Sequence, residues 1–546
     1  MAGSSASIAA KASWIPLIVV MLCQVQLAFN AWNVSITGIT QDLGITATAV
    51  GTANTASTFA VSAFILLGAK ITAKIGPRLA FRIGVLVPAL AALAIATAQD
   101  GSVLFFAQAL TGASNAITLP ALTVIIAASF QGKQQASAIG YFAASIPLAQ
   151  VTSLLIAGYF ASTIGWRWSF VLVASLGLLN FAMSFFLKPI PAQKNLVVDW
   201  TGGAMAATAI ISFSFGFSLM NDWGLLAASS NAPFDIFGFS PVPLMFVAGA
   251  ILAQLFLSRT RARMAANKVP LVNLDIAKDP TERATITVMG LMLFVGTAVS
   301  FLLPLYMQVV QGFVGIQVSL AVIPYTISIF VANTLVSRLY DKVPPRIIAR
   351  VSMGVVTAAL VWLALTISND WGQASIVVGL VVLGLAQGCV VALVFNSLLT
   401  ASPKESAGDV GAVRGLTHNL SGSAGIAVGS ALAVGLLSSA AFAAATDSEV
   451  FTPQVVEQIN FDNVNFFTNS QLENALIAAT DATPEEIDYA VEQFSAARLD
   501  ALRTTMLVMG GLAALAIVPA GRMPGFQKED LYVGYPEKDV KASSSK

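Results

Sequence analysis

The amino-acid sequence predicts an all-α integral membrane protein with fourteen transmembrane helices, arranged as two six-helix repeats plus a two-helix insert. Three observations predict this class. Hydrophobic residues make up 56% of the 546 residues and charged residues only 10%, whereas soluble domains have about 25% charged residues. The apolar residues lie in stretches of about 20, the length that crosses a bilayer as a helix. A ten-residue loop motif also occurs twice, at equivalent places in the chain.

Each predicted span is an apolar stretch bounded by polar or charged residues. The first stretch follows Lys11 and resembles a signal peptide, but it is too long for one, so we expect an uncleaved helix. The predicted spans cover residues 14–36, 48–68, 79–98, 103–130, 137–161, 167–187, 201–221, 241–258, 284–309, 316–337, 348–368, 372–400, 407–438 and 501–521.

The basic residues predict how these spans are oriented. Cytoplasmic loops of membrane proteins carry an excess of Lys and Arg. With the N-terminus in the cytoplasm, all but three of the 28 Lys and Arg residues fall on the cytoplasmic side, the exceptions being Arg167, Arg498 and Arg503. We therefore expect a multi-pass protein of the plasma or inner membrane with both termini in the cytoplasm.

The repeated motif predicts how the spans are grouped. The loops AKITAKIGPR at 69–78 and SRLYDKVPPR at 337–346 share their basic, aliphatic and Pro-Arg positions, and each joins the second and third span of its half. Many transporters place their site between two such repeats. The predicted parts are an N-terminal six-helix bundle, a two-helix insert with a basic cytoplasmic loop, a C-terminal six-helix bundle and a cytoplasmic tail, over residues 1–190, 191–279, 280–523 and 524–546.

An acidic segment at residues 440–498 is predicted to lie outside the cell. It has ten carboxylates from Asp447 to Glu492 and no Lys or Arg before Arg498. Within it, Thr483-Pro484-Glu485-Glu486 is a capping box with proline at the first helical position, which predicts a helix running into the last span. The segment is either a solvated loop or a docking surface for an extracytoplasmic partner.

Several short motifs resemble those of the major facilitator superfamily, and within it the fourteen-helix drug:proton antiporter branch. The resemblance covers nearly the whole chain. Besides the paired loops and the outside segment, it depends on Trp166-Arg167-Trp168-Ser169-Phe170, Asp199-Trp200-Thr201-Gly202 and Ser421-Gly422-Ser423-Ala424-Gly425-Ile426-Ala427. It implies an alternating-access transporter and implies gate or coupling roles for Lys74, Arg78, Asp341 and Arg346.

The chain departs from that branch at positions tied to proton coupling, all in its first half. The acidic residue usual in the first span aligns with Ala28, and the Asp usual in the first loop motif aligns with Ala73. The Arg usual in the fourth span aligns with Gln108, and the Gly-Pro of the fifth span aligns with Ser153-Leu154. Proton antiport is therefore a weak implication of the resemblance.

Neutral polar residues dominate the interior of the predicted spans, because every Asp and Glu falls near a span end. Each amide is either interhelical packing glue or a lining residue of a central cavity, and an amide-lined cavity favours a neutral or hydrophobic cargo. The polar set is Asn30, Asn33, Asn54, Gln108, Asn115, Gln150, Asn180, Gln254, Gln308, Gln311, Asn333, Gln387, Asn396, His418 and Asn419. The predicted substrate-cavity residues are Asn30, Asn33, Gln108, Asn115, Gln308, Gln311 and Asn396.

The single histidine, His418, lies in a regular series of glycines in the thirteenth span. Steps of three or four residues place it on one helix face that allows close approach of a neighbouring helix, together with Gly411, Gly415, Gly422, Gly425 and Gly429. We place it roughly 15 Å to the cytoplasmic side of the bilayer centre.

Three roles fit His418. It makes an interhelical hydrogen bond beside the glycines, or it titrates near neutral pH in place of the missing carboxylate, or it joins Asp409 and Arg414 in a cytoplasmic gate. Arg414, one turn earlier, would oppose its protonation by like-charge repulsion.

The leading function is export of amphipathic or hydrophobic small molecules. The alternatives are export of an endogenous envelope lipid or metabolite, and a non-transporting membrane scaffold or sensor. The expected partners are a small-molecule substrate and the lipid bilayer, and the net charge of +1 argues against nucleic acid. One histidine, the isolated Cys23 and Cys389 and no carboxylate cluster predict no enzyme, metal site or cofactor.

Overall fold

The computed structural model describes residues 13–29, 31–130, 132–274, 279–339, 343–368, 374–401, 407–446, 469–480 and 482–523. Their regular structure is helical, apart from isolated bridges that Phe239 makes with Ala227 and Ile236. Twelve of the described helices are long and apolar enough to cross a membrane, or thirteen with one bent pair counted as a single span. The predicted all-α membrane class is confirmed.

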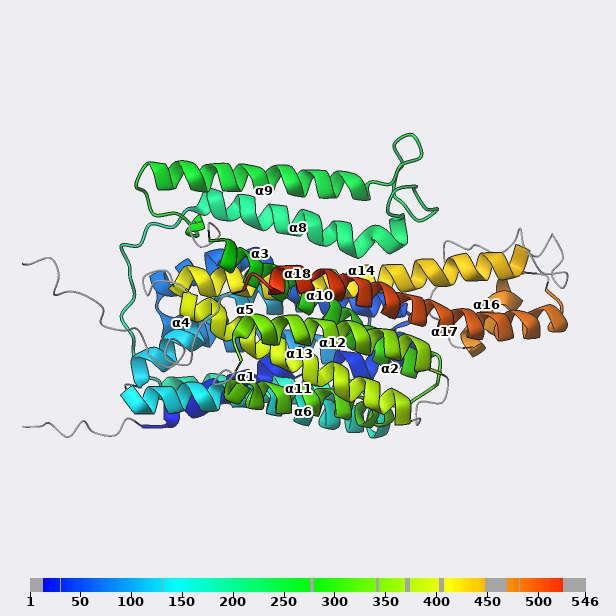
Figure 1. The fold of residues 1–546 in the computed structure, drawn as a ribbon, viewed down its shortest axis with the longest axis horizontal. Coiled ribbons are helices and arrows are strands. Elements are labelled where there is room, and N and C mark those ends of the chain that lie inside the picture. The colour runs from blue at the N-terminus through cyan, green and yellow to red at the C-terminus, as the bar shows by residue number, and fades with distance from the viewer. Residues whose placement is uncertain are drawn as a thin grey trace, which may run out of the picture.

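Seven helices and a 3-10 helix form the first part of the chain, which is drawn in blue to cyan in Figure 1. The sixth, 32 residues long, covers the remaining predicted span at 137–161, and its stretch Leu148–Thr163 is a shorter apolar helix. The elements are α1 (Ile15–Ala28), α2 (Trp32–Leu43), α3 (Ala47–Ile75), α4 (Pro77–Ala96), α5 (Gly101–Ser129), α6 (Gly132–Thr163), α7 (Arg167–Met183) and η1 (Ser184–Phe186).

The first predicted span, 14–36, is not one straight helix. It is broken into α1 and α2, which meet at an angle of 49°. Phe29 leaves the helical region with a ψ of 105°, and the new helix starts beside Trp32, whose ring packs edge-on to Phe170 of α7. Hydropathy alone does not show this break, because the apolar character continues across it.

The insert is a helical hairpin of α8 (Trp200–Trp223) and α9 (Val242–Ala265). Figure 1 shows the pair along one side of the bundle, with α8 between α9 and the rest. Helix α8 packs on α3 and α14, whereas the main packing of α9 is against α8 alone. Leu244, Val247, Ile251 and Leu255 of α9 are about half exposed and follow one helix face, which suits contact with lipid.

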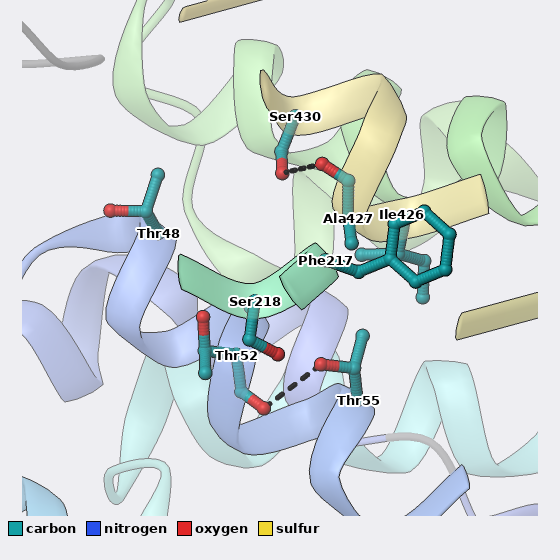
Figure 2. A pocket seen from close by; sticks show the side chains of 9 residues that line it. Thr48, Thr52, Thr55, Phe217, Ser218, Ile426, Ala427 and Ser430 are labelled. Carbon is teal, nitrogen blue, oxygen red and sulfur yellow. Dashed lines mark hydrogen bonds between the residues drawn. The ribbon is translucent and has the colours of Figure 1, made fainter. Parts of the chain in front are cut away.

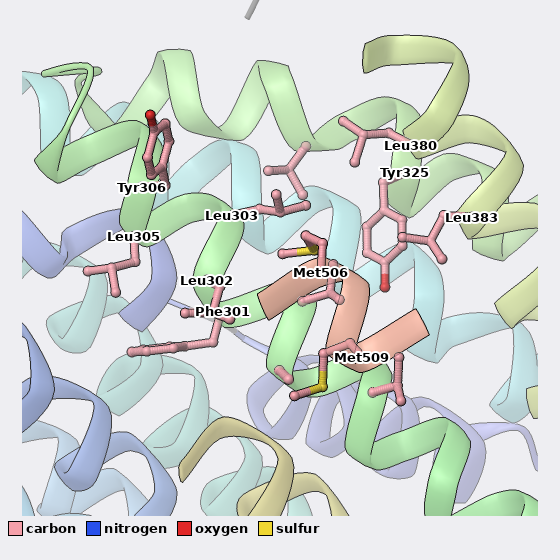
Figure 3. Packing of buried hydrophobic residues seen from close by; sticks show 14 of the residues in the cluster. Phe301, Leu302, Leu303, Leu305, Tyr306, Tyr325, Leu380, Leu383, Met506 and Met509 are labelled. Atoms are coloured by element: carbon pink, nitrogen blue, oxygen red, sulfur yellow. The ribbon is translucent and has the colours of Figure 1, made fainter. Parts of the chain in front are cut away.

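The remaining helices form the second part of the chain. They are α10 (Pro280–Val309), α11 (Gly315–Leu339), α12 (Pro345–Thr366), α13 (Ala374–Ala401), α14 (Ala407–Thr446), α16 (Asn469–Ala479), α17 (Pro484–Leu515) and α18 (Ile517–Ala520). Their apolar core includes side chains from α10, α11, α13 and α17, such as Phe301, Tyr325, Leu380 and Met506 (Figure 3).

We call the end of the bundle where α3 ends and α10 begins the inner end, and the opposite end the outer end. The predicted orientation makes the inner end cytoplasmic. Helix α14 has 40 residues, about 60 Å at 1.5 Å per residue, so it extends beyond a bilayer core of about 30 Å. Its outer part projects from the bundle together with α16 and the start of α17 (Figure 1).

The predicted capping box at the start of α17 is confirmed. Thr483 accepts a hydrogen bond from the backbone N–H of Glu486, and the Glu486 side chain accepts one from the backbone N–H of Thr483. Further along the helix, Arg498 is fully buried and contacts Asn469 of α16 and the ring of Phe494. The described part of the acidic segment is therefore helical and held together by Arg498, and its helix α17 packs on α12 and α14 of the bundle.

Candidate functional site

The candidate site is the interface between the first part of the chain (α1–α7) and the second part (α10–α18). Three sets of packed helices make most of this interface, namely α3 with α14, α6 with α11, and α2 with both α10 and α11. Helix α1 packs mainly on α5, α6 and α7 of its own part. Of the broken first span, the outer piece α2 packs both on α3 and α6 of its own part and, across the interface, on α10 and α11.

Helix α2 is tied to α10 by a group of hydrogen bonds that we call the outer latch, made by Asn33, Thr37, Ser300 and Gln308. Asn33 Nδ2 donates to the Ser300 carbonyl at 3.1 Å, and the Thr37 backbone N–H donates to Gln308 Oε1 at 3.4 Å. Gln308 Nε2 donates to the Asn33 carbonyl. Gln308 is 2% exposed, so its own side chain is shielded from water in these bonds.

Helices α6 and α11 meet at their outer ends. The backbone N–H of Ile316 donates to Ser162 Oγ at 2.8 Å, and Ser319 Oγ donates to the Leu154 carbonyl at 2.8 Å. A Cβ atom at Gly158 would lie 2.1 Å from Ser319 Oγ and 2.8 Å from the carbonyl oxygen of Gly315. This approach therefore requires glycine at position 158.

Helices α3 and α14 meet beside the insert. Ser423 donates to the hydroxyl of Thr58 across the interface. Further toward the outer end, α3, α8 and α14 enclose a hollow of about 340 Å³, including space open to solvent (Figure 2). Its lining carries five hydroxyl groups and no charged group, and consists of Thr48, Gly51, Thr52, Thr55, Phe217, Ser218, Ile426, Ala427 and Ser430.

The glycine face of α14 is covered by α10 in its outer half. A Cβ atom at Gly425 would lie 2.1 Å from the Phe294 carbonyl oxygen, and one at Gly429 would lie 2.9 Å from Ala298 Cβ. Thr297 Oγ1 donates to the Gly422 carbonyl at 2.7 Å. The predicted close approach at these glycines is confirmed.

His418 lies on the same face, seven and eleven residues before Gly425 and Gly429, yet its side chain is exposed. No hydrogen bond of His418 to another described residue is observed. The covering by α10 at the outer glycines does not extend to His418, although α10 still lies beside α14 at this level, where a Cβ atom at Gly290 would lie 3.7 Å from Thr417 Cγ2. Arg414 is partly exposed one turn further inward.

The other predicted cavity residues are spread over the bundle. Gln108 and Asn115 lie seven residues apart on α5, and Gln108 is buried. Gln311, just beyond α10, donates to the Ser368 carbonyl at 3.3 Å, beyond the end of α12. Asn30 lies outside the described residues, and Asn396 lies on α13 with its side chain outside them. The described contacts thus bring together only Asn33 and Gln308.

The predicted gate residues lie at the inner ends of helices. Arg78 donates to the Phe185 carbonyl at 2.9 Å, which ties the start of α4 to η1. Lys74 lies in the last turn of α3, and Arg346 is exposed at the start of α12. Asp341 lies outside the described residues, and so does the side chain of Asp409 on α14.

Asp199 has a structural role that the sequence showed only as part of a motif. It caps α8, and its carboxylate pairs with Arg259 at 2.8 Å and Arg263 at 3.4 Å on α9. Burial raises the pKa of Asp199, but the hydrogen bonds from Arg259 and the Gly202 backbone N–H, with both guanidinium charges, hold that pKa below its usual range. The inner ends of the hairpin are thereby joined.

Comparison with known proteins identifies the family. The model of the Major Facilitator Superfamily matches residues 18–426, so this chain belongs to the Major Facilitator Superfamily, a family of membrane transporters and not of enzymes. The chain is 15% identical to a bacterial homolog of the human lysosomal transporter Spinster, with a TM-score of 0.60 over 95% of this chain and 98% of that one. This likeness shows a shared fold.

Related proteins include named and uncharacterised transporters. The chain is 24% identical over 295 residues to the uncharacterised transporter EfpA of Mycobacterium tuberculosis, covering 54% of this chain and about half (52%) of that relative. It is 23% identical to the probable actinorhodin transporter of Streptomyces coelicolor, over 80% and 75% of the two chains. It is 22% identical to the puromycin resistance protein pur8 of Streptomyces alboniger, over 76% and 80%.

Proposed function

We propose that this protein exports amphipathic or hydrophobic small molecules by alternating access, with both termini in the cytoplasm. The observation that carries the proposal is the asymmetry of the interface. Hydrogen bonds of α2 with α10 and of α6 with α11 hold its outer end closed, whereas His418, toward the inner end, is exposed. This arrangement corresponds to a state that receives cargo from the cytoplasm. Relatives named for antibiotic transport or resistance support export.

The cycle follows from the same contacts. Cargo enters from the inner end, the inner ends of the two parts approach, and the outer contacts separate to release it outside. The arrangement closed at the outer end and the arrangement closed at the inner end must differ in free energy by only a few kcal/mol for the cycle to run. The outer latch uses a few hydrogen bonds between neutral groups, each with a net contribution of about 1 kcal/mol. Such bonds can break within a transport cycle.

The driving force we propose does not depend on an intramembrane carboxylate. In the described helices that cross the membrane, Asp and Glu occur only in the first or last turn, with helix α17 as the exception. The acidic residues of α17 run from its start to Asp500 and lie toward the outer end of the bundle. A carboxylate that carries protons across the membrane would have to lie deeper. Export driven by exchange against a second solute, or by the concentration gradient of the cargo itself, fits this distribution of charge.

Export of an endogenous envelope lipid or metabolite is the second candidate. This candidate is favoured by α16 and the extended α14 and α17, because these helices reach beyond the outer end, where they can bind an extracytoplasmic partner. Both candidates predict solute movement, unlike a scaffold or sensor.

Reconstitution into proteoliposomes tests the proposal. Lipophilic fluorescent dyes would be loaded, and their movement followed with and without an imposed pH gradient, with empty liposomes as control. Dye movement that depends on the protein and survives a proton ionophore supports the proposal. Movement abolished by the ionophore would instead show proton coupling. If the dyes do not move under any solute or ion gradient, the protein is better described as a non-transporting scaffold or sensor than as a transporter.

A further inference from the structure

The loop between α8 and α9 carries many exposed apolar side chains. It covers residues 224–241, joins the two helices of the insert at the outer end of the bundle, and contains no Lys or Arg. Six of its large apolar side chains are at least 40% exposed, namely Leu225, Leu226, Phe234, Ile236, Phe237 and Phe239. Apolar side chains gathered in this way on a surface mark a contact with a membrane or another molecule.

The tip of this loop is a tight turn held by backbone hydrogen bonds. The backbone N–H groups of Ile236 and Phe239 each donate to the carbonyl of the other residue at 3.0 Å. Between them, Phe237 and Gly238 have φ angles of 54° and 83°, the pair of positive values that defines a type I′ turn. The Gly238 N–H also donates to Asp235 Oδ2 at 2.8 Å. The shape of the tip is therefore fixed without the side chain of Phe237.

Phenylalanine is an unfavourable residue at this position of the turn. The first central position of a type I′ turn is normally Asn, Asp or Gly, and a bulky side chain with a positive φ is strained. The side chain of Phe237 is 97% exposed, so packing within the chain does not offset this strain. A strained residue that presents an apolar ring to its surroundings indicates a partner outside the chain.

The surroundings of the loop indicate that this partner is lipid. Helices α8 and α9 are both long and apolar enough to cross the membrane, so their outer ends bring the loop to the membrane surface. The exposed apolar face of α9 begins at Leu244, directly after the loop, and α9 packs mainly on α8. Part of the loop reaches past α9 on the side away from the bundle (Figure 1), where lipid surrounds the hairpin.

We propose that the α8–α9 loop inserts into the bilayer leaflet at the outer end of the bundle, with Phe237 as its deepest side chain. The ring lies at the boundary between the lipid headgroups and the acyl chains, where surface-bound helices also bury their apolar residues. Because the loop has no Lys or Arg, insertion depends on its apolar side chains and not on attraction to anionic headgroups. The inference does not depend on the cargo or on the direction of transport.

Spin-label accessibility in nanodiscs of phosphatidylcholine tests the insertion. Single cysteines in the full-length chain, with both native cysteines replaced by serine, are labelled with a nitroxide. Collisions of the label with O2, which concentrates in the bilayer, are compared with collisions with a water-soluble nickel chelate. The lipid reference is Ile251→Cys on the exposed face of α9, and the water reference is Ile477→Cys on α16. We expect the O2-to-nickel ratio at Phe237→Cys to lie above the water reference and to approach the lipid reference.

A second set of variants separates insertion from the shape of the turn. The label is placed at Ile236→Cys, whose turn bonds are made by its backbone. Phe237→Asn suits a type I′ turn and removes the ring. It should lower the ratio of inserted to solvated loops by about tenfold or more, the effect of not burying one phenyl ring, and so move the label toward the water reference. Phe237→Trp keeps an aromatic ring and should leave the label in lipid.

A label at Phe237→Cys that meets the nickel chelate as often as Ile477→Cys does would overturn the inference, because the tip would then be solvated. Low accessibility to both O2 and the chelate would also overturn it, because the tip would then be covered by protein, such as a second copy of this chain. An unchanged ratio at Ile236→Cys after Phe237→Asn would contradict the assignment of Phe237 as the inserting side chain.

Discussion

Gln308 of α10 donates a hydrogen bond to the backbone carbonyl of Asn33 in α2 and accepts one from the backbone N–H of Thr37. One buried side chain thus joins the outer piece of the broken first span to the other part of the chain. These bonds go to backbone groups, which no substitution in α2 removes directly. Gln308 is therefore the residue through which the outer latch can be weakened most selectively.

Replacing Gln308 with leucine should favour opening of the outer end. The change removes the hydrogen bonds of Gln308 to the Asn33 carbonyl and the Thr37 N–H, which keep only their bonding within α2. The cost to the closed state is about 0.5–1.5 kcal/mol for each lost bond, or about two- to tenfold per bond in the ratio of open to closed molecules. The measurement is the labelling rate of Ser300→Cys by an impermeant maleimide added outside. Gln254→Leu, at an exposed position of α9, is the control. An unchanged rate in Gln308→Leu would show that the latch does not hold the outer end.

A methyl group at position 158 should prevent closure between α6 and α11. It would lie 2.1 Å from Ser319 Oγ, and such overpacking costs about 1–3 kcal/mol. We expect Gly158→Ala to reduce the transport rate by about tenfold or more, and Ser319→Gly to restore part of it. Gly354→Ala, where the methyl group meets nothing within 4 Å, should transport normally. Equal effects of Gly158→Ala and Gly354→Ala on the transport rate would contradict the proposed role of the contact between α6 and α11.

The helix class, the approximate spans and the start of α17 could be predicted because they depend on local patterns. The break after Phe29 could not, since apolar residues continue across it. Asn33 and Gln308 were predicted to line a substrate cavity, and the structure shows both bonded to backbone groups of the other part of the chain. Amides look the same in sequence whether they bond to substrate or to backbone. Ser319 and Ser423 gave no signal, because serines in helices commonly bond their own carbonyl four residues earlier, as these two also do.

The ion pairs of Asp199 should hold the insert hairpin together through mild acidification. The pKa of Asp199 is held below its usual range, so its contribution to stability is present above the ordinary pKa of an aspartate and is lost only as the pH falls through the lower, folded-state value. Asp199→Asn should lower the Tm at pH 7, and the difference between variant and wild type should persist at pH 5. Asp235→Asn, in the exposed turn between α8 and α9, is the control. A difference that vanishes already at pH 5 would contradict this account.

The orientation of the chain predicts which surface positions can be labelled from outside. Ile477 on α16 is 60% exposed and lies beyond the outer end, whereas Arg261 on α9 is exposed at the inner end. In intact cells, an impermeant maleimide should label Ile477→Cys at once and Arg261→Cys only after the membrane is permeabilised. Both variants are made in a background with Cys23 and Cys389 replaced by serine. The reverse order of labelling would invert the proposed direction of transport.

The central claim is that the two parts of the chain move relative to each other across the interface between them in each transport cycle. Thr58 of α3 and Ser423 of α14 are in side-chain contact across that interface, so the double variant Thr58→Cys/Ser423→Cys in the same cysteine-free background can form a disulfide there. Transport in proteoliposomes is measured after oxidation and again after reduction, with each single variant as control. We predict that oxidation stops transport in the double variant alone and that reduction restores it. Undiminished transport by the fully cross-linked protein would contradict alternating access through this interface.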